Sequence, residues 1–118
     1  MATITVPTEM YHRTPLKVDI LGSEWDICFD QIKMPEGTAG ICREEARMIR
    51  IARPDNIAPD SPYPEACVRR VLRHELTHAM LAECGLGVES DWTEEQVDWV
   101  ARQFPKLKEL FSKTECDK

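Results

Sequence analysis

The feature that most constrains this chain is the segment His74-Glu75-Leu76-Thr77-His78, which lies within a run of apolar residues spaced as in a helix. Successive residues of an α-helix are rotated by about 100°, so the two histidines share one face, one turn apart. Their imidazoles can therefore bind the same metal ion. Glu75 is rotated away from that face, which leaves its carboxylate available as a general base for a metal-bound water. The alternative is that two histidines simply pack on a helix.

The surrounding sequence predicts one long helix over residues 63–84. Four prolines within residues 53–64 predict a surface loop at 54–62, and proline is tolerated in the first turn of the helix that follows. Gly85 stands where a left-handed residue commonly ends a helix. The two histidines fall on an apolar stripe of this helix that comprises Cys67, Val71, His74, His78 and Leu81, with Val68, Leu72, Ala79 and Ala82 beside it.

The first 53 residues are predicted to be rich in β-strands. Apolar and polar residues alternate over 16–21 and again over 25–29, and the break at Gly22 allows these two strands to pair as a hairpin. Shorter patterns predict further strands at 3–6, 40–43 and 48–52. The segment 7–15, between the first of these strands and the strand at 16–21, is predicted to be a loop.

A second helical region is predicted at 93–113. Thr93 and Gln96 have the spacing of a capping box, and acidic residues follow Thr93 in the first turn, where they also suit the helix dipole. Pro105 is expected to break or kink this region, so that a short third helix follows it.

The third metal ligand is less obvious, because a catalytic zinc site needs three protein ligands and a free position. The chain has only three histidines, so the third ligand is His12, a carboxylate or a thiolate. In one known motif the third ligand stands six residues after the second histidine, which is the position of Cys84. That motif has a glycine turn that is absent here, so the helix continues and Cys84 points away.

The first turn of the helix at 93–113 provides a better candidate. Glu94 and Asp98 are four residues apart and lie on one face, so we expect Glu94 to bind the metal and Asp98 to accept a hydrogen bond from a ligand histidine. Glu95, Asp91 and Asp98 stay open as alternative ligands. Which of these side chains reaches the histidines depends on the conformation of the loop 85–92, and the sequence does not fix that conformation. Acidic residues also occur in first helical turns without any metal.

The segment from His74 to His78, followed by E-E-Q-V-D-W-V-A from Glu94 to Ala101, resembles the gluzincin branch of the zincin metallopeptidases. More narrowly, it is similar to ImmA/IrrE-type and small phage-encoded zincin-like proteins, in which a glutamate opens the helix after the H-E-x-x-H helix. The resemblance covers residues 71–104. It implies one minimal zincin-like α+β domain over 1–118, with a small, mostly antiparallel sheet packed on the motif helix and C-terminal helices on the other side of the site.

The resemblance also implies an activity. Zinc would be bound by His74, His78 and Glu94, and a protein or peptide substrate would be hydrolysed with Glu75 as general base. Strand 48–52 would offer an edge to an extended peptide. The candidates for stabilising the oxyanion are Tyr11, His12 and Tyr63.

Two alternatives remain open. One is a zincin-fold interaction protein that holds zinc with little or no peptidase activity, such as an accessory or regulatory factor of a phage or prophage. The other is a helix and sheet domain without metal.

Length and composition limit the number of domains, the class of partner and the cellular location that can be expected. A length of 118 residues suits one domain, and a net charge of −6 argues against nucleic acid as a partner. The five cysteines are scattered, with no C-x-x-C pair, which favours reduced thiols and a cytoplasmic location. No signal peptide or membrane-spanning segment is expected. Oligomeric state and substrate preference have no signal in the sequence.

Overall fold

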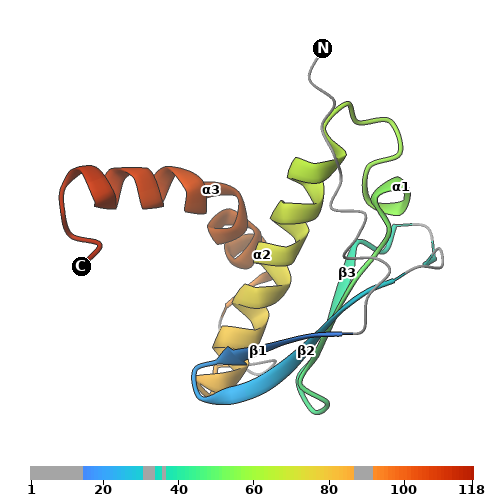
Figure 1. Ribbon diagram of the computed structural model, residues 1–118, viewed down its shortest axis with the longest axis horizontal. Coiled ribbons are helices and arrows are strands. Elements are labelled where there is room, and N and C mark those ends of the chain that lie inside the picture. Colours follow the sequence, from blue (N-terminus) through green and yellow to red (C-terminus); the bar gives the residue numbers. More distant parts are fainter. Residues whose placement is uncertain (1–14, 31–33, 36, 87–91) are drawn as a thin grey trace.

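The computed structural model describes residues 15–30, 34–35, 37–86 and 92–118. These residues form an α+β fold in which four strands make one sheet and three helices follow (Figure 1). The elements are β1 (Leu16–Ile20), β2 (Ser23–Phe29), β3 (Gly40–Arg43), β4 (Met48–Ile51), α1 (Pro54–Ile57), α2 (Pro64–Glu83) and α3 (Glu94–Lys113). The predicted strand at 3–6 and the loop residues Tyr11 and His12 lie outside the described residues.

The sheet has the strand order β1-β2-β4-β3. The hairpins β1-β2 and β3-β4 are antiparallel, as expected for a mostly antiparallel sheet, but the central pair β2-β4 is parallel, which makes the sheet mixed. Alternating polarity cannot distinguish the two pairings, because a buried strand has the same pattern in both. β4 has a neighbour on each side, so the expectation that 48–52 supplies a sheet edge is wrong. The edges of the described sheet are β1 and β3, and β3 has the more extensive contact with α2.

The core lies between one face of the sheet and α2. Trp25 and Ile27 of β2, Ile49 and Ile51 of β4, and Val68 of α2 are almost completely buried there. Burial of such side chains contributes about 1.5 to 3 kcal/mol each, which makes this contact the main support of the motif helix.

The C-terminal end of α2 is attached to the sheet by Glu83. One oxygen of its carboxylate accepts hydrogen bonds from Trp25 Nε1 and from Arg47 Nε, both at 3.0 Å. Trp25 lies on β2, and Arg47 lies in the turn between β3 and β4. These bonds hold the helix end in a defined place relative to the sheet.

α2 spans nearly the predicted length. Its N-cap is Tyr63, and Gly85 adopts a left-handed φ of +80° just after the end, which confirms the predicted stop. The predicted loop at 54–62, in contrast, contains the single-turn helix α1. Pro54 occupies its first turn, where the missing N–H costs nothing, and the Ala58 N–H closes the turn on the Pro54 carbonyl.

α3 begins with the predicted capping box. Thr93 Oγ1 accepts a hydrogen bond from the Gln96 N–H at 3.1 Å, and the Gln96 side chain accepts one from the Thr93 N–H at 2.8 Å. Of the two outcomes expected at Pro105, a break followed by a separate third helix is wrong, because α3 continues to Lys113. Pro105 cannot donate to the Ala101 carbonyl, but Arg73 Nε of α2 donates to that oxygen at 2.6 Å. A side chain of the neighbouring helix thus replaces the lost backbone donor.

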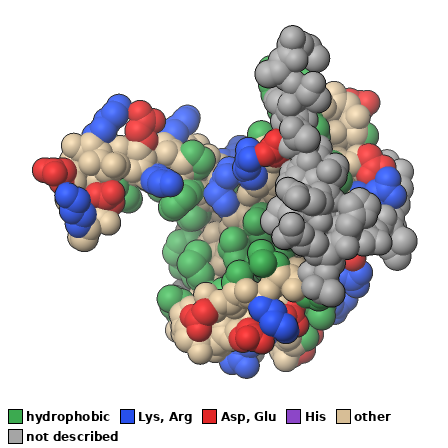
Figure 2. All heavy atoms as spheres, viewed as in Figure 1, with side chains coloured by type: hydrophobic (Ala, Val, Ile, Leu, Met, Phe, Trp, Pro, Cys, Tyr) green, Lys and Arg blue, Asp and Glu red, His purple; other side chains and the backbone are tan. Residues whose placement is uncertain are grey.

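The C-terminal half of α3 extends away from the rest of the molecule (Figure 1). Acidic and basic side chains are both displayed on this projecting part (Figure 2). No helix within the described ranges combines the length and hydropathy that a membrane span requires.

Candidate metal centre

α2 and α3 bring three potential metal ligands together: His74, His78 and Glu94. Their ligand atoms all lie within 4.8 Å of one another. His74 Nε2 is 2.9 Å from Glu94 Oε2, and His78 Nε2 is 3.0 Å from Glu94 Oε1. The two imidazole centroids are 5.0 Å apart, as expected for residues one helical turn apart.

The position of Glu94 follows from how α3 packs on α2. The capping box fixes the first turn of α3, and Val97 and Ala101 are buried on the side facing α2. Glu94 lies one turn before Val97 on the same side of the helix, so its carboxylate reaches the two histidines.

This donor set fits a divalent transition metal. Ligand atoms bound to one zinc ion at about 2.0 to 2.2 Å lie about 3 to 4 Å from each other in a tetrahedral site, close to the separations found here. Two imidazoles and one carboxylate are also the ligands of known catalytic zinc sites. The same donors suit other divalent ions, so the donor set alone does not select zinc.

The ionisation of Glu94 favours metal binding. Partial burial alone would raise its pKa, but hydrogen bonds from His78 and His74, together with their charges, lower the pKa overall. The carboxylate is therefore ionised at neutral pH, as a metal ligand must be.

Glu75 lies beside the ligands without being one of them. Its side chain is only 7% exposed, and it has no hydrogen-bond or ion-pair partner in the part of the chain that the structure describes. Burial raises the pKa of its carboxyl group, and the neighbouring His74 and His78 oppose this effect. A buried carboxylate without a partner costs stability, which makes Glu75 a candidate for a chemical role in this site.

Gly40 at the start of β3 makes room for Glu75. A Cβ atom at Gly40 would lie 2.9 Å from Glu75 Cγ, 3.0 Å from Glu75 Oε2 and 3.0 Å from Val71 Cγ1. Sequence analysis did not identify this residue as part of the site. The available signal was a glycine at a strand position, which often marks a close approach of another group.

Asp98 lies where it was expected, beside a ligand histidine. Its Oδ1 is 3.3 Å from His74 Nδ1, and its Oδ2 forms an ion pair with Arg102 Nε at 3.0 Å. A proton on His74 Nδ1 shared with Asp98 leaves Nε2 free to bind a metal. Arg102 was not identified from the sequence, although an Asp and an Arg four residues apart on a helix commonly pair.

The other residues considered from the sequence do not join this group. Glu95 is exposed and is not one of the clustered ligands, and Cys84 is exposed at the end of α2. Tyr63 is 59% exposed and does not line the cavity described below. Asp91, Tyr11 and His12 lie outside the described residues.

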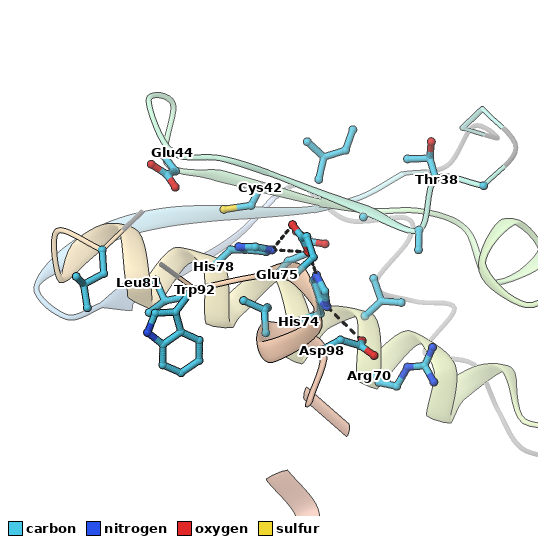
Figure 3. A pocket seen from close by; sticks show the side chains of 18 residues that line it. Thr38, Cys42, Glu44, Arg70, His74, Glu75, His78, Leu81, Trp92 and Asp98 are labelled. Atoms are coloured by element: carbon cyan, nitrogen blue, oxygen red, sulfur yellow. Dashed lines mark hydrogen bonds and ion pairs between the residues drawn. The ribbon is translucent and has the colours of Figure 1, made fainter. Parts of the chain in front are cut away.

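The clustered ligands and Glu75 line a cavity of about 780 Å³. β3 forms one wall of it, and the first turn of α3 with Trp92 forms the other (Figure 3). No family model, curated protein or solved structure matches this chain. The chemistry of the site must therefore be inferred from its own atoms: three converging ligand groups, a buried carboxylate beside them and a cavity large enough for a short segment of peptide.

Proposed function

We propose that this protein is a minimal zincin-like metallopeptidase that hydrolyses peptide bonds of a protein substrate with the help of zinc. The observation that carries the proposal is the position of Glu75, which is buried next to His74, His78 and Glu94 and has no hydrogen-bond or ion-pair partner among the described residues. A structural zinc site has four protein ligands and needs no base, whereas a catalytic site has three ligands and a base beside them.

In this mechanism His74, His78 and Glu94 would hold the ion, and Asp98 would keep the His74 ring in the required tautomer. Zinc, when bound, supplies a water with a pKa of about 7 and polarises the substrate carbonyl. Glu75 accepts the proton of the attacking water and then donates it to the leaving amine. Burial acts on the pKa of Glu75 in the direction that suits a general base, because it raises the pKa above that of an exposed carboxyl group.

An extended substrate would pair with the edge strand β3, and not with β4 (Met48–Ile51) as expected from the sequence. Gly40, Ile41 and Cys42 line the cavity next to Glu75, and their strand is one of the two edge strands of the described sheet. Backbone pairing with β3 would place a peptide carbonyl above the clustered ligands. A co-crystal structure with the peptide bound away from β3 would contradict this arrangement.

A second candidate is an interaction protein that holds zinc but hydrolyses little. It is favoured by the position of Tyr63, which is exposed and away from the cavity, so that it cannot stabilise an oxyanion at the metal centre. The two candidates share the metal site and differ in the need for Glu75.

The test of the metal site is elemental analysis of purified protein after incubation with zinc and removal of the excess. Wild type should contain about one zinc per chain, and His78→Ala and Glu94→Ala should lose it. Glu95→Ala is the matched control, because it removes a neighbouring carboxylate outside the ligand cluster and should retain zinc. A wild-type protein that binds no metal would rule out both candidates.

A further inference from the structure

We propose that the cavity selects its substrate by charge: Arg70 binds a carboxylate at one end, and an apolar side chain of the same peptide binds at the other end. That the ligand is a peptide rests on the proposed function, whereas the recognition of a carboxylate by Arg70 can be tested separately.

The two ends of the cavity lie on opposite sides of the ligand histidines (Figure 3). Arg70 is one turn before His74 on α2, so it lines the cavity at one end. Leu81 follows His78 by almost one turn and lines the other end together with Trp92. Leu86 lies against the same end, because its N–H donates to the Leu81 carbonyl at 2.7 Å.

The charge of Arg70 is available to a ligand. Its neighbour Arg69 forms an ion pair with Glu65, and Arg73 donates to the Ala101 carbonyl. Arg70 has no ion pair or hydrogen bond to any residue within the described ranges. A guanidinium group can donate two parallel hydrogen bonds to one carboxylate, which makes it the side chain best suited to recognise that group.

Glu44 makes the two ends of the cavity opposite in charge. It lines the end that contains Leu81 and Trp92, far from Arg70 (Figure 3). Asp98 also lines the cavity near Arg70 (Figure 3), but its carboxylate is paired with Arg102 and contacts His74 Nδ1. A substrate carboxylate would be repelled by Glu44 and attracted by Arg70, so the opposite orientation of an acidic peptide is disfavoured.

The spacing along α2 defines where the carboxylate should be. Arg70 precedes the midpoint of the two ligand histidines by six residues, or about 9 Å of helix. An extended peptide advances about 3.3 Å per residue, so this distance corresponds to about two or three residues.

The polarity of β3 indicates on which side of the scissile bond this carboxylate lies. β3 starts at Gly40, beside Val71 of α2, and continues toward Glu44. A peptide paired antiparallel to β3 therefore has its C-terminal part near Arg70. The carboxylate then belongs to Asp or Glu two or three residues after the scissile bond, or to the free C-terminus of the peptide at that position.

The test uses a library of N-acetylated peptides, half with a free C-terminus and half amidated, digested by zinc-loaded protein and analysed by mass spectrometry. Wild type should favour Asp or Glu over Asn or Gln at the stated position of amidated peptides by roughly five- to tenfold. A preference confined to peptides with a free C-terminus would assign the recognised carboxylate to the terminus. Arg70→Glu should reverse the preference toward Lys and Arg. Arg69→Glu is the matched control, since Arg69 does not line the cavity and should leave the preference unchanged.

Peptide binding provides a readout that does not depend on turnover. Arg70 and Leu81 are 11 residues apart on α2, about 16.5 Å, which corresponds to about five residues of an extended peptide. Fluorescent alanine-based peptides with one leucine, and with Asp, Asn or Lys five residues after it, are therefore titrated into zinc-loaded Glu75→Gln protein with and without Arg70→Glu. The Asp peptide should bind more tightly to the protein that retains Arg70. The Lys peptide should bind more tightly to the protein that carries Arg70→Glu. The same ranking of peptides by both proteins would overturn the proposal. Charge-dependent binding without cleavage by wild type would support the role of Arg70 while refuting the peptidase activity.

Discussion

The carboxylate of Glu75 distinguishes a peptidase from a protein that only holds zinc. Glu75→Gln keeps the size of the side chain but removes the proton acceptor, so peptide hydrolysis should fall by about 10² to 10⁴-fold while zinc content stays at the wild-type value. Hydrolysis of the peptide library and elemental analysis of the same samples measure both effects. Glu95→Gln is the matched control and should change neither. A Glu75→Gln protein with full activity would show that Glu75 is not the base.

Gly40 should be as sensitive to substitution as a residue of the metal site. In Gly40→Ala the new Cβ would meet Glu75 and the buried Val71 at about 3 Å, and Val71 is held in the core. We expect activity to fall at least tenfold and the melting temperature to decrease, with zinc still bound, because the displaced carboxylate is not a ligand. A variant with normal activity would mean that Glu75 can move without consequence.

The bonds of Glu83 link the end of α2 to two places in the sheet. Hydrogen bonds from Arg47, Ser23 and Trp25, in that order of importance, lower its pKa from 4.5 to about 2. A depressed folded-state pKa stabilises the fold above the unfolded-state value and loses this contribution as the pH falls from 4.5 toward 2. The melting temperature of wild type should thus fall more steeply across this range than that of Glu83→Gln. Parallel curves for the two proteins would contradict this link.

The contact between Arg73 and the Ala101 carbonyl compensates for Pro105. Arg73→Met removes the donor and should lower the free energy of unfolding in urea by about 1 to 2 kcal/mol. Pro105→Ala restores a backbone N–H for that carbonyl, so Arg73→Met should cost less in the Pro105→Ala background. Arg69→Met serves as control, because its exposed ion pair contributes at most about 1 kcal/mol. Equal costs of Arg73→Met in both backgrounds would refute the compensation.

These elements also show why parts of the fold could be predicted and others could not. The limits of α2 and the capping box of α3 depend on neighbouring residues, so the sequence indicated them correctly. The continuation of α3 through Pro105 depends on Arg73, a residue on another helix. The parallel pairing of β2 with β4 depends on the path of the chain between them, and alternating polarity contains no information about it.

The candidate site was predicted in a similar way. The pairing of His74 with His78 follows from helical spacing, and Glu94 and Asp98 were favoured by their place in the next helix. That Glu94 rather than Glu95 faces the histidines is decided by the packing of Val97 and Ala101 on α2. Arg70 had no signal in the sequence, because its role appears only when the cavity is formed.

Zinc should stabilise the whole chain, because its ligands come from two separate helices. At a free zinc concentration about 1,000 times the dissociation constant, binding adds about 4 kcal/mol to the free energy of unfolding. Removal of zinc with a chelator should therefore lower the melting temperature of wild type clearly. Glu94→Ala, which lacks one ligand, should respond much less to the same chelator. Identical responses of the two proteins would mean that Glu94 is not a ligand.

Because the three clustered groups lie on two helices, retention of a metal bound at the proposed site would depend on the docking of α3 onto α2. The histidine pair is complete as soon as α2 is helical, but Glu94 arrives only when α3 docks, and α3 is anchored by few buried side chains, chiefly Val97 and Ala101. The sheet and α2 have a separate core. Detachment of α3 is therefore the least costly way to open the molecule, and the protein is expected to release its ion before the rest of the fold melts.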